Sequence, residues 1–190
     1  MDAFWQSTAL IALAEMGDKS QLVALAYATR YSWQVALAGV TLATLVVHLL
    51  SVLLGEALGQ ALPTFWIQVA SGVAFICFAL WTLRGDTYTD KEGPRGPRFG
   101  PLLTVAGTFF LSELGDKTML ATVTLAAQRQ AAVAIWLGST LGMVAADAVA
   151  IMAGRVLGQR LPERAIKLVA AGIFFLFGVL TLVQALATMS

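Results

Sequence analysis

Apolar residues fill most of the chain in long runs that short polar segments separate. Six of these runs contain about 20 residues or more, the length that an α-helix needs to cross about 30 Å of hydrocarbon. Their approximate ranges are 4–28, 35–57, 65–84, 101–127, 131–154 and 165–187. The pattern therefore predicts an all-α membrane protein with six transmembrane helices.

Composition supports a membrane protein and narrows its class. Of the 190 residues, 58% are hydrophobic and 12% are charged, whereas soluble domains have about 25% charged residues. We expect the first run to be a retained helix and not a cleaved signal peptide, because no Lys or Arg precedes it and Glu15 interrupts it. The single cysteine, Cys77, excludes a disulfide framework within the chain and a metal site built from several cysteines.

The basic residues outside the runs are distributed unequally. With six crossings the loops alternate between the two sides, and nearly all of these Lys and Arg residues fall on one side. That side receives Arg30, Arg84, Lys91, Arg95, Arg98, Arg155, Arg160, Arg164 and Lys167, and the other receives Arg129. The positive-inside rule then places segments 29–34, 85–100 and 155–164 in the cytoplasm and both termini outside. Orientation explains the basic loops, so no nucleic-acid partner is expected.

The chain is an internal duplication. The segment EMGDKS at residues 15–20 recurs as ELGDKT at residues 113–118, and residues 55–63 match residues 154–162. Each copy contains three predicted helices, an odd number, so the copies must cross the membrane in opposite directions. We therefore expect two inverted-topology three-helix repeats, an arrangement typical of secondary transporters. The expected parts are residues 1–84, a cytoplasmic linker at 85–100, and residues 101–190.

The repeated segment carries carboxylates into the apolar runs. Glu15 and Asp18 are three residues apart, as are Glu113 and Asp116, so on a helix each pair would share one face. Each pair lies near the middle of its run, and inversion would bring the pairs together from opposite sides. Converging carboxylates repel in a low dielectric unless protons or a cation compensate, and hard divalent cations prefer oxygen ligands. The four acids are thus the predicted metal site, with the metal as a transported substrate and no prosthetic group.

The glycines between the acids, Gly17 and Gly115, admit two interpretations. Glycine lets a helix break, and freed carbonyls could then supply further oxygen ligands. Alternatively, glycine lets a neighbouring helix pack closely without any break. If the helices break, the candidates to cap the resumed segments are Asp18 or Ser20 and Asp116 or Thr118.

The motif lysines, Lys19 and Lys117, are either ion-pair partners of the acids or parts of a gate that fills the site when the cation leaves. Four carboxylates and two ammonium groups carry two net negative charges. One divalent cation or two protons would neutralise them, so an electroneutral exchange of one metal ion for two protons is expected.

A second pair of polar residues lies in the apolar runs. His48 and Asp147 occupy equivalent positions of the two repeats. They are either members of a proton relay or outer ligands, or polar groups satisfied by packing within the bundle. Three small residues, Gly39, Gly138 and Gly142, permit close helix contacts within one chain or between two, so a homodimer stays open.

The paired E-x-G-D-[KR]-[ST] motifs resemble those of the family once called uncharacterised protein family 0016. It includes bacterial manganese exporters, chloroplast manganese transporters and a Golgi calcium/manganese transporter. The resemblance covers essentially the whole chain, and it implies transport of Mn²⁺, in some members Ca²⁺, in exchange for protons, with the motif acids at the ion site. The short chain looks like a bacterial representative, which implies manganese efflux across the inner membrane.

Other functions fit these residues less well. An uncoupled cation channel would use similar carboxylates, but two inverted halves suit alternating access better. An exporter of amino acids or other small organic solutes is disfavoured by the two acidic pairs, although Lys19 and Lys117 keep it open. An intramembrane aspartyl protease could use Asp18 and Asp116, but it has no use for the duplicated glutamate and lysine, so no enzyme is expected.

Overall fold

The computed structural model describes residues 2–84, 100–129, 131–157 and 163–187, with the backbone alone for 155–157 and 163–167. The secondary structure of these residues is helical throughout, without strands, as the sequence predicts. The helices are α1 (Asp2–Glu15), α2 (Lys19–Arg30), α3 (Trp33–Ala61), α4 (Thr64–Arg84), α5 (Pro101–Glu113), α6 (Lys117–Arg129), α7 (Ala132–Leu157) and α8 (Glu163–Ala187).

Four of these helices contain segments long and apolar enough to cross a membrane. The segments are Trp33–Ala61, Thr64–Arg84, Ala132–Gly154 and Leu168–Ala187. They coincide with four of the six predicted runs. The other two runs, 4–28 and 101–127, are each divided into two shorter helices, α1 with α2 and α5 with α6. The division falls at the repeated motif in both cases. Of the predicted linker at 85–100, all but Gly100 lies outside the described residues.

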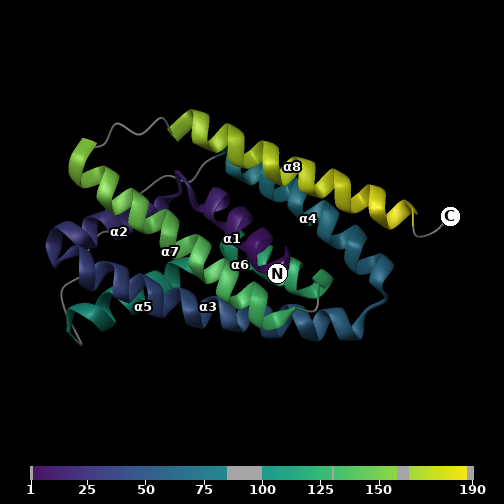
Figure 1. Ribbon diagram of the computed structural model, residues 1–190, viewed down its shortest axis with the longest axis horizontal. Helices are drawn as coiled ribbons and strands as arrows, with labels where there is room; N and C mark the ends of the chain where they lie inside the picture. The colour runs from purple at the N-terminus through teal and green to yellow at the C-terminus, as the bar shows by residue number, and fades with distance from the viewer. Residues whose placement is uncertain (1, 85–99, 130, 158–162, 188–190) are drawn as a thin grey trace.

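The helices of the two halves are interleaved. Figure 1 shows α4 and α8 side by side along one edge, with α7 and α3 running across the rest of the bundle. Helix α1 packs mainly on α7, whereas α5 and α6 pack mainly on α3. Helices α1, α5 and α6 are therefore held by the long helix of the other half, whereas α2 packs equally on α3 and α7.

The contact between α4 and α8 is reciprocal. Phe75 stacks on Phe174, with ring centroids 6.1 Å apart. Phe75 also meets the edge of Phe177, and Phe174 meets the edge of Phe78 in the same way, at 5.7 and 5.9 Å. Phe75 and Phe78 correspond to Phe174 and Phe177 in the aligned repeats, so exchanging the halves reproduces the contact.

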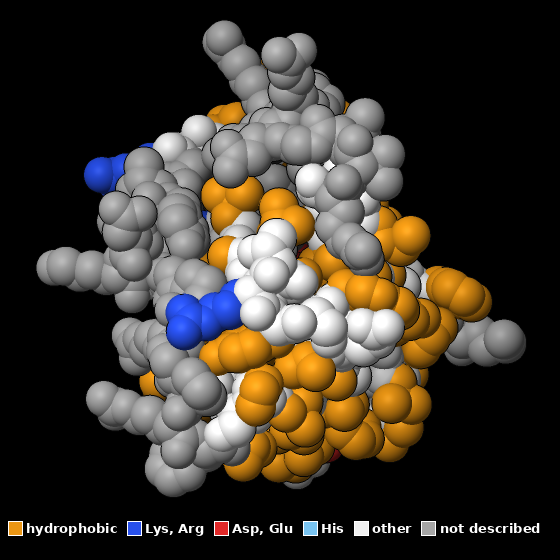
Figure 2. Space-filling view, turned by 90° about the vertical axis from the view of Figure 1, so that its left-hand side faces the viewer, with side chains coloured by type: hydrophobic (Ala, Val, Ile, Leu, Met, Phe, Trp, Pro, Cys, Tyr) orange, Lys and Arg blue, Asp and Glu red, His pale blue; other side chains and the backbone are white. Residues whose placement is uncertain are grey.

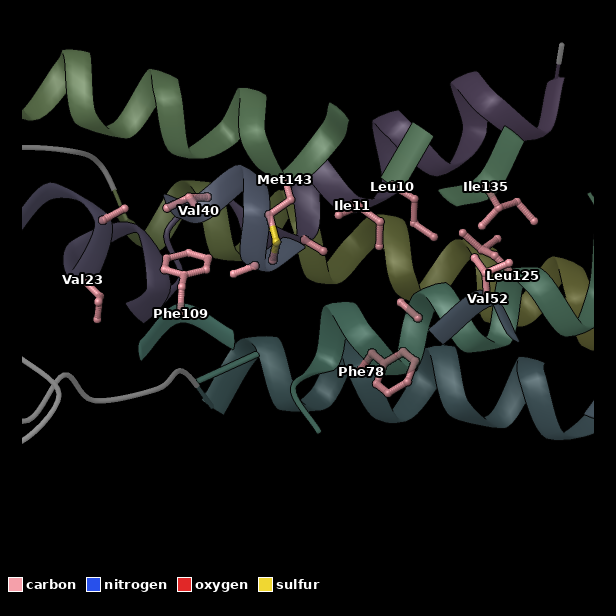
Figure 3. Packing of buried hydrophobic residues seen from close by; sticks show 14 of the residues in the cluster. Leu10, Ile11, Val23, Val40, Val52, Phe78, Phe109, Leu125, Ile135 and Met143 are labelled. Atoms are coloured by element: carbon pink, nitrogen blue, oxygen red, sulfur yellow. The ribbon is translucent and has the colours of Figure 1, made fainter. Parts of the chain in front are cut away.

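A buried apolar core joins the two halves. In Figure 3, Val52, Leu125 and Ile135, from α3, α6 and α7, gather at one end of the core. Nearer the middle lies Met143, whose sulfur accepts a 3.2 Å hydrogen bond from the hydroxyl of Thr44. Thr44 and Met143 are also equivalent positions of the two repeats, so α3 and α7 meet at corresponding points.

The outer surface has apolar sides, and basic residues lie at its ends. Leucine and valine side chains of the long helices are exposed, for example Leu80 and Val183. Arg30 and Arg84 end α2 and α4. Figure 2 views the molecule from the side toward which α2 and α4 run and shows Lys and Arg side chains there. An apolar surface of this kind suits a lipid environment.

Candidate cation site

The first motif interrupts its helix at a glycine. Helix α1 ends at Glu15, and Gly17 has φ 77°, a conformation that only glycine adopts at little cost. The turn is closed by a 3.0 Å hydrogen bond from the backbone N–H of Asp18 to the carbonyl of Glu15. Asp18 itself is extended, with φ −82° and ψ 162°, and α2 begins at Lys19. The chain therefore breaks between its two acidic residues.

The second motif repeats this geometry. Helix α5 ends at Glu113, Gly115 has φ 80°, and the Asp116 N–H donates to the Glu113 carbonyl at 3.2 Å. A Cβ at Gly115 would meet no atom within 4 Å. Close helix packing thus does not explain Gly115, and its backbone conformation does. Of the two interpretations of the motif glycines, the structure contains the helix break.

The motif hydroxyls bond to the glutamates. Ser20 Oγ donates to Glu15 Oε1, and Thr118 Oγ1 donates to Glu113 Oε2 at 3.0 Å. The sequence offered Ser20 and Thr118 as candidate helix caps. This expectation is wrong for both side chains, because their hydroxyls donate to the motif glutamates instead. Asp18 stands at the N-cap position of α2, but its side chain makes no capping hydrogen bond. Carboxylates buried in apolar surroundings need donors more than the helix ends do, because an unsatisfied buried charge is very costly.

A buried ion pair joins the two motifs. Lys117 Nζ lies 2.5 Å from Asp18 Oδ1, and both side chains are buried. The lysine comes from the second motif and the aspartate from the first, so the two motifs do meet in the interior. Lys19, the counterpart of Lys117, is only partly buried.

The remaining acids lie around this ion pair. The carboxylates of Glu15, Asp18, Glu113 and Asp147 act on one another electrostatically, and each is at most 5% exposed. Asp116 is also buried, and its charge acts on Glu113. The structure thus gathers all four predicted ligands, together with Asp147, into one acidic cluster around Lys117. Within the described part of the chain, no three Asp, Glu, His or Cys side chains are close enough to hold a metal ion together.

The second predicted polar pair is fully buried. His48 and Asp147 are 0% exposed, and neither ring nitrogen nor either carboxylate oxygen has a hydrogen-bond partner among the described residues. Packing within the described residues therefore supplies no hydrogen bond to either side chain. Asp147 belongs to the acidic cluster through its proximity to Asp18.

A further polar residue at the first break was missed by the sequence analysis. Gln21 Oε1 accepts a 2.8 Å hydrogen bond from the Gly17 N–H, and Gln21 Nε2 donates to the Ala146 carbonyl at 3.1 Å. Its counterpart is Met119, whose sulfur receives the Gly115 N–H at 3.2 Å. One sequence signal could have identified Gln21. It is an amide side chain within an apolar run, one residue beyond the repeated segment, where the two copies cease to match.

The protein has apolar helices of membrane-spanning length, and they surround a buried cluster of acids and a lysine. This arrangement defines a membrane protein with charged groups in its interior. Such groups are costly in a bilayer and mark transport pathways. The chain belongs to the divalent cation/proton antiporter family GDT1, whose sequence profile matches residues 3–90 and 101–189. The family resemblance read from the two motifs is thereby confirmed, and with it the expectation of a transporter.

Individual relatives agree with this membership. A candidate manganese exporter of Vibrio cholerae serotype O1 is 35% identical over 179 residues, which cover 92% of this chain and 88% of the relative. A GDT1-like protein of Synechocystis is 30% identical, with 95% of this chain and 97% of the relative covered. The GDT1-like protein 5 of Arabidopsis thaliana is 26% identical over 96% of both chains. No solved structure matches the chain significantly.

Proposed function

We propose that this chain exports Mn²⁺ from the cytoplasm in exchange for protons, with Ca²⁺ as the alternative substrate. The cation would bind at the helix breaks, to Glu15, Asp18, Glu113 and Asp116. The observation that carries the proposal is the buried ion pair between Lys117 of one repeat and Asp18 of the other. It brings a positive charge into a cluster of acids that both repeats supply.

The chemistry of this cluster supports a cation substrate. The Lys117 ammonium group forms an ion pair with Asp18 and so occupies the position of a bound cation. A mobile cation that binds Asp18 must displace this ammonium group. Glu15 and Glu113 each hold a hydroxyl donor from their own motif and keep further oxygen lone pairs for a metal ion. Oxygen ligands of this kind suit Mn²⁺ and Ca²⁺. Exchange of one such ion for two protons would keep the cluster electrically balanced.

The dimensions of the divided helices support six membrane crossings. Helices α1 and α2 have 14 and 12 residues, and α5 and α6 have 13 each, which correspond to about 20 Å of rise per helix. Each divided pair is thus long enough to cross about 30 Å of hydrocarbon with its break near the middle. The reciprocal contacts of Phe75 and Phe78 with Phe174 and Phe177 support two inverted repeats. The basic residues would place both termini outside the inner membrane.

Asp147 and His48 are the proposed proton carriers. Both are fully buried, and their polar atoms have no hydrogen-bond partner among the described residues. Asp147 lies near Asp18, where it could take up a proton as the metal ion leaves. A reversible proton site needs this combination of burial and proximity to the changing charge.

A single chain suffices for this function. The glycines that left a homodimer open are used within the chain: a Cβ at Gly39 would collide with Val105 of α5, and one at Gly138 or Gly142 would collide with the α1 backbone at Phe4 or Thr8. The proposed site is likewise built from the two halves of one chain.

The test is metal-driven proton movement in proteoliposomes, with Mn²⁺ and Ca²⁺ compared. We expect Mn²⁺ to drive proton counter-movement without net current, and Glu15→Gln or Glu113→Gln to abolish it. Glu56→Gln, the same change outside the motifs, is the matched control and should keep the parent rate. Fast flux with current and no proton coupling would indicate a channel. If neither metal moves protons and the motif variants behave like the parent, the proposal is wrong. Export of a small organic solute is then the next function to test.

A further inference from the structure

The two helix breaks differ in what holds them. At each break, the glycine N–H lies outside regular helical hydrogen bonding and needs an acceptor. The first break has the amide oxygen of Gln21, 2.8 Å from the Gly17 nitrogen. The second has the sulfur of Met119, 3.2 Å from the Gly115 nitrogen. A thioether is a weak acceptor, so the first break is held more firmly.

Gln21 also makes a bond that its counterpart cannot make. Its Nε2 donates to the Ala146 carbonyl of α7, in the other half of the chain, at 3.1 Å. Met119 has no donor and therefore cannot reach across in this way. The hydrogen bond to Ala146 is buried and the one from Gly17 is part-buried, so losing them leaves polar groups unsatisfied in the interior.

The two residues that Gln21 connects are direct neighbours of site residues. Gly17 precedes Asp18, and Ala146 precedes Asp147. One side chain thus fixes the distance between a proposed metal ligand and a proposed proton carrier. The second repeat has no equivalent connection through Met119, although its motif is otherwise the same.

We propose that Gln21 is a positioning residue that locks the first helix break onto α7 and so sets the place of Asp18 relative to Asp147. The inference rests on the proposed function for its transport consequence. It makes the two breaks unequal: Gln21 ties the first break to α7, and Met119 makes no such tie at the second. Gln21 touches neither the cation nor the proton and acts through Asp18.

The transport test exchanges the residues of the two repeats. Gln21→Met copies the second break into the first, and Met119→Leu is the matched control at the second. We expect Gln21→Met to raise the KM for Mn²⁺ about tenfold while kcat changes less than threefold. A tenfold change corresponds to about 1.4 kcal/mol, which the loss of two neutral hydrogen bonds can account for. Met119→Leu should change both constants less than twofold.

A second measurement tests the lock without transport. In protein labelled with ¹⁵N-glycine, the amide of Gly17 should exchange its hydrogen at least tenfold more slowly than that of Gly115, and Gln21→Met should remove the difference. Because Gly115 is exposed and Gly17 is half-buried, the support for the lock is the loss of this difference in folded Gln21→Met, while equal exchange in the parent chain overturns the lock even if the variant fails to fold. Equal exchange at the two glycines, or an unchanged KM in folded Gln21→Met, overturns the inference. If the parent moves neither Mn²⁺ nor protons, the proposed function fails, while the exchange result still decides on the lock.

Discussion

Replacing Lys117 by methionine tests whether this lysine stands in for the transported cation. Methionine keeps most of the length and apolar volume of the lysine stem and removes the ammonium group. In the structure that group lies 2.5 Å from Asp18 Oδ1, with Glu15 also within its electrostatic reach. The variant therefore leaves the acidic cluster without this compensating charge.

The distance sets the scale of the effect. At an effective dielectric constant of about 20, two unit charges 2.5 Å apart attract by about 7 kcal/mol. Desolvation of both groups offsets part of this, and removing one partner of a buried pair costs about 3–5 kcal/mol. For a chain of this size, about 3 kcal/mol corresponds to a fall in Tm of roughly 10 °C. We expect that fall for metal-free Lys117→Met in detergent.

The decisive assay is the same melting experiment with Mn²⁺ added. A ligand at about 100 times its Kd stabilises by about 2.7 kcal/mol, so Mn²⁺ should restore most of the lost Tm. If the ion has to displace Lys117 in the parent, as the proposed function requires, its stabilising effect there should be clearly smaller. Lys19→Met, the same change at the partly buried counterpart, should lose less Tm. Equal stabilisation of parent and Lys117→Met by Mn²⁺ would show that Lys117 and the metal ion do not compete.

Two further predictions concern the local structure of the motifs. Ser20→Ala and Thr118→Val each remove the hydroxyl that donates to the buried glutamate of the same motif. Hydrogen bonds to charged groups contribute about 1.5–3 kcal/mol, so Mn²⁺-driven proton movement should fall at least tenfold in each variant. Parent rates of proton movement in both variants would contradict the assignment of these hydroxyls. Gly115→Ala should destabilise the protein by about 1–2 kcal/mol through its positive φ alone, because the added methyl group meets open space. Gly107→Ala, inside helix α5 and also in open space, should be neutral or stabilising by up to about 1 kcal/mol in the same melting assay, and equal effects of the two changes would refute the backbone explanation.

Much of this architecture can be predicted from the sequence, because the signals are periodic and strong. The four undivided apolar runs agree with helices of membrane-spanning length. The motif repeat indicates that distant acids meet, and Lys117 does contact Asp18 across the two halves. The family follows from the same residues, since the acids and the lysine recur at fixed spacing.

The details that escaped prediction depend on competition between neighbours in three dimensions. Glycine permits both a helix break and a close contact, and only the φ of Gly17 and Gly115 separates them. A hydroxyl next to a helix start predicts a cap, yet Ser20 turns to the buried carboxylate of Glu15. The function of Gln21 depends on a carbonyl 125 residues away, which no local pattern reveals.

The packing of the divided helices shows a second inequality between the halves. Helix α6 lies directly on α3: a Cβ at Gly55 would collide with the carbonyl of Val123. Helix α2 approaches α7 less closely, because the three atoms nearest to a Cβ at Gly154, the counterpart of Gly55, would all belong to the side chain of Leu25. Helix α6 thus contacts α3 backbone to backbone, whereas the flexible side chain of Leu25 separates α2 from α7.

If the two halves are inverted repeats, as proposed, alternating access requires them to exchange these environments, so that α2 closes on α7 while α6 loosens from α3. Gly55→Ala should therefore destabilise the conformation described here, by about 1–3 kcal/mol in a melting assay, since backbone must shift. Gly154→Ala should leave the free energy of unfolding within about 1 kcal/mol of the parent, because Leu25 can give way. The same methyl group would obstruct the closed approach of α2 in the exchanged conformation, so Mn²⁺-driven proton movement should fall at least tenfold. Parent turnover in Gly154→Ala would mean that α2 never packs on α7 as α6 packs on α3, and alternating access would then require a different motion.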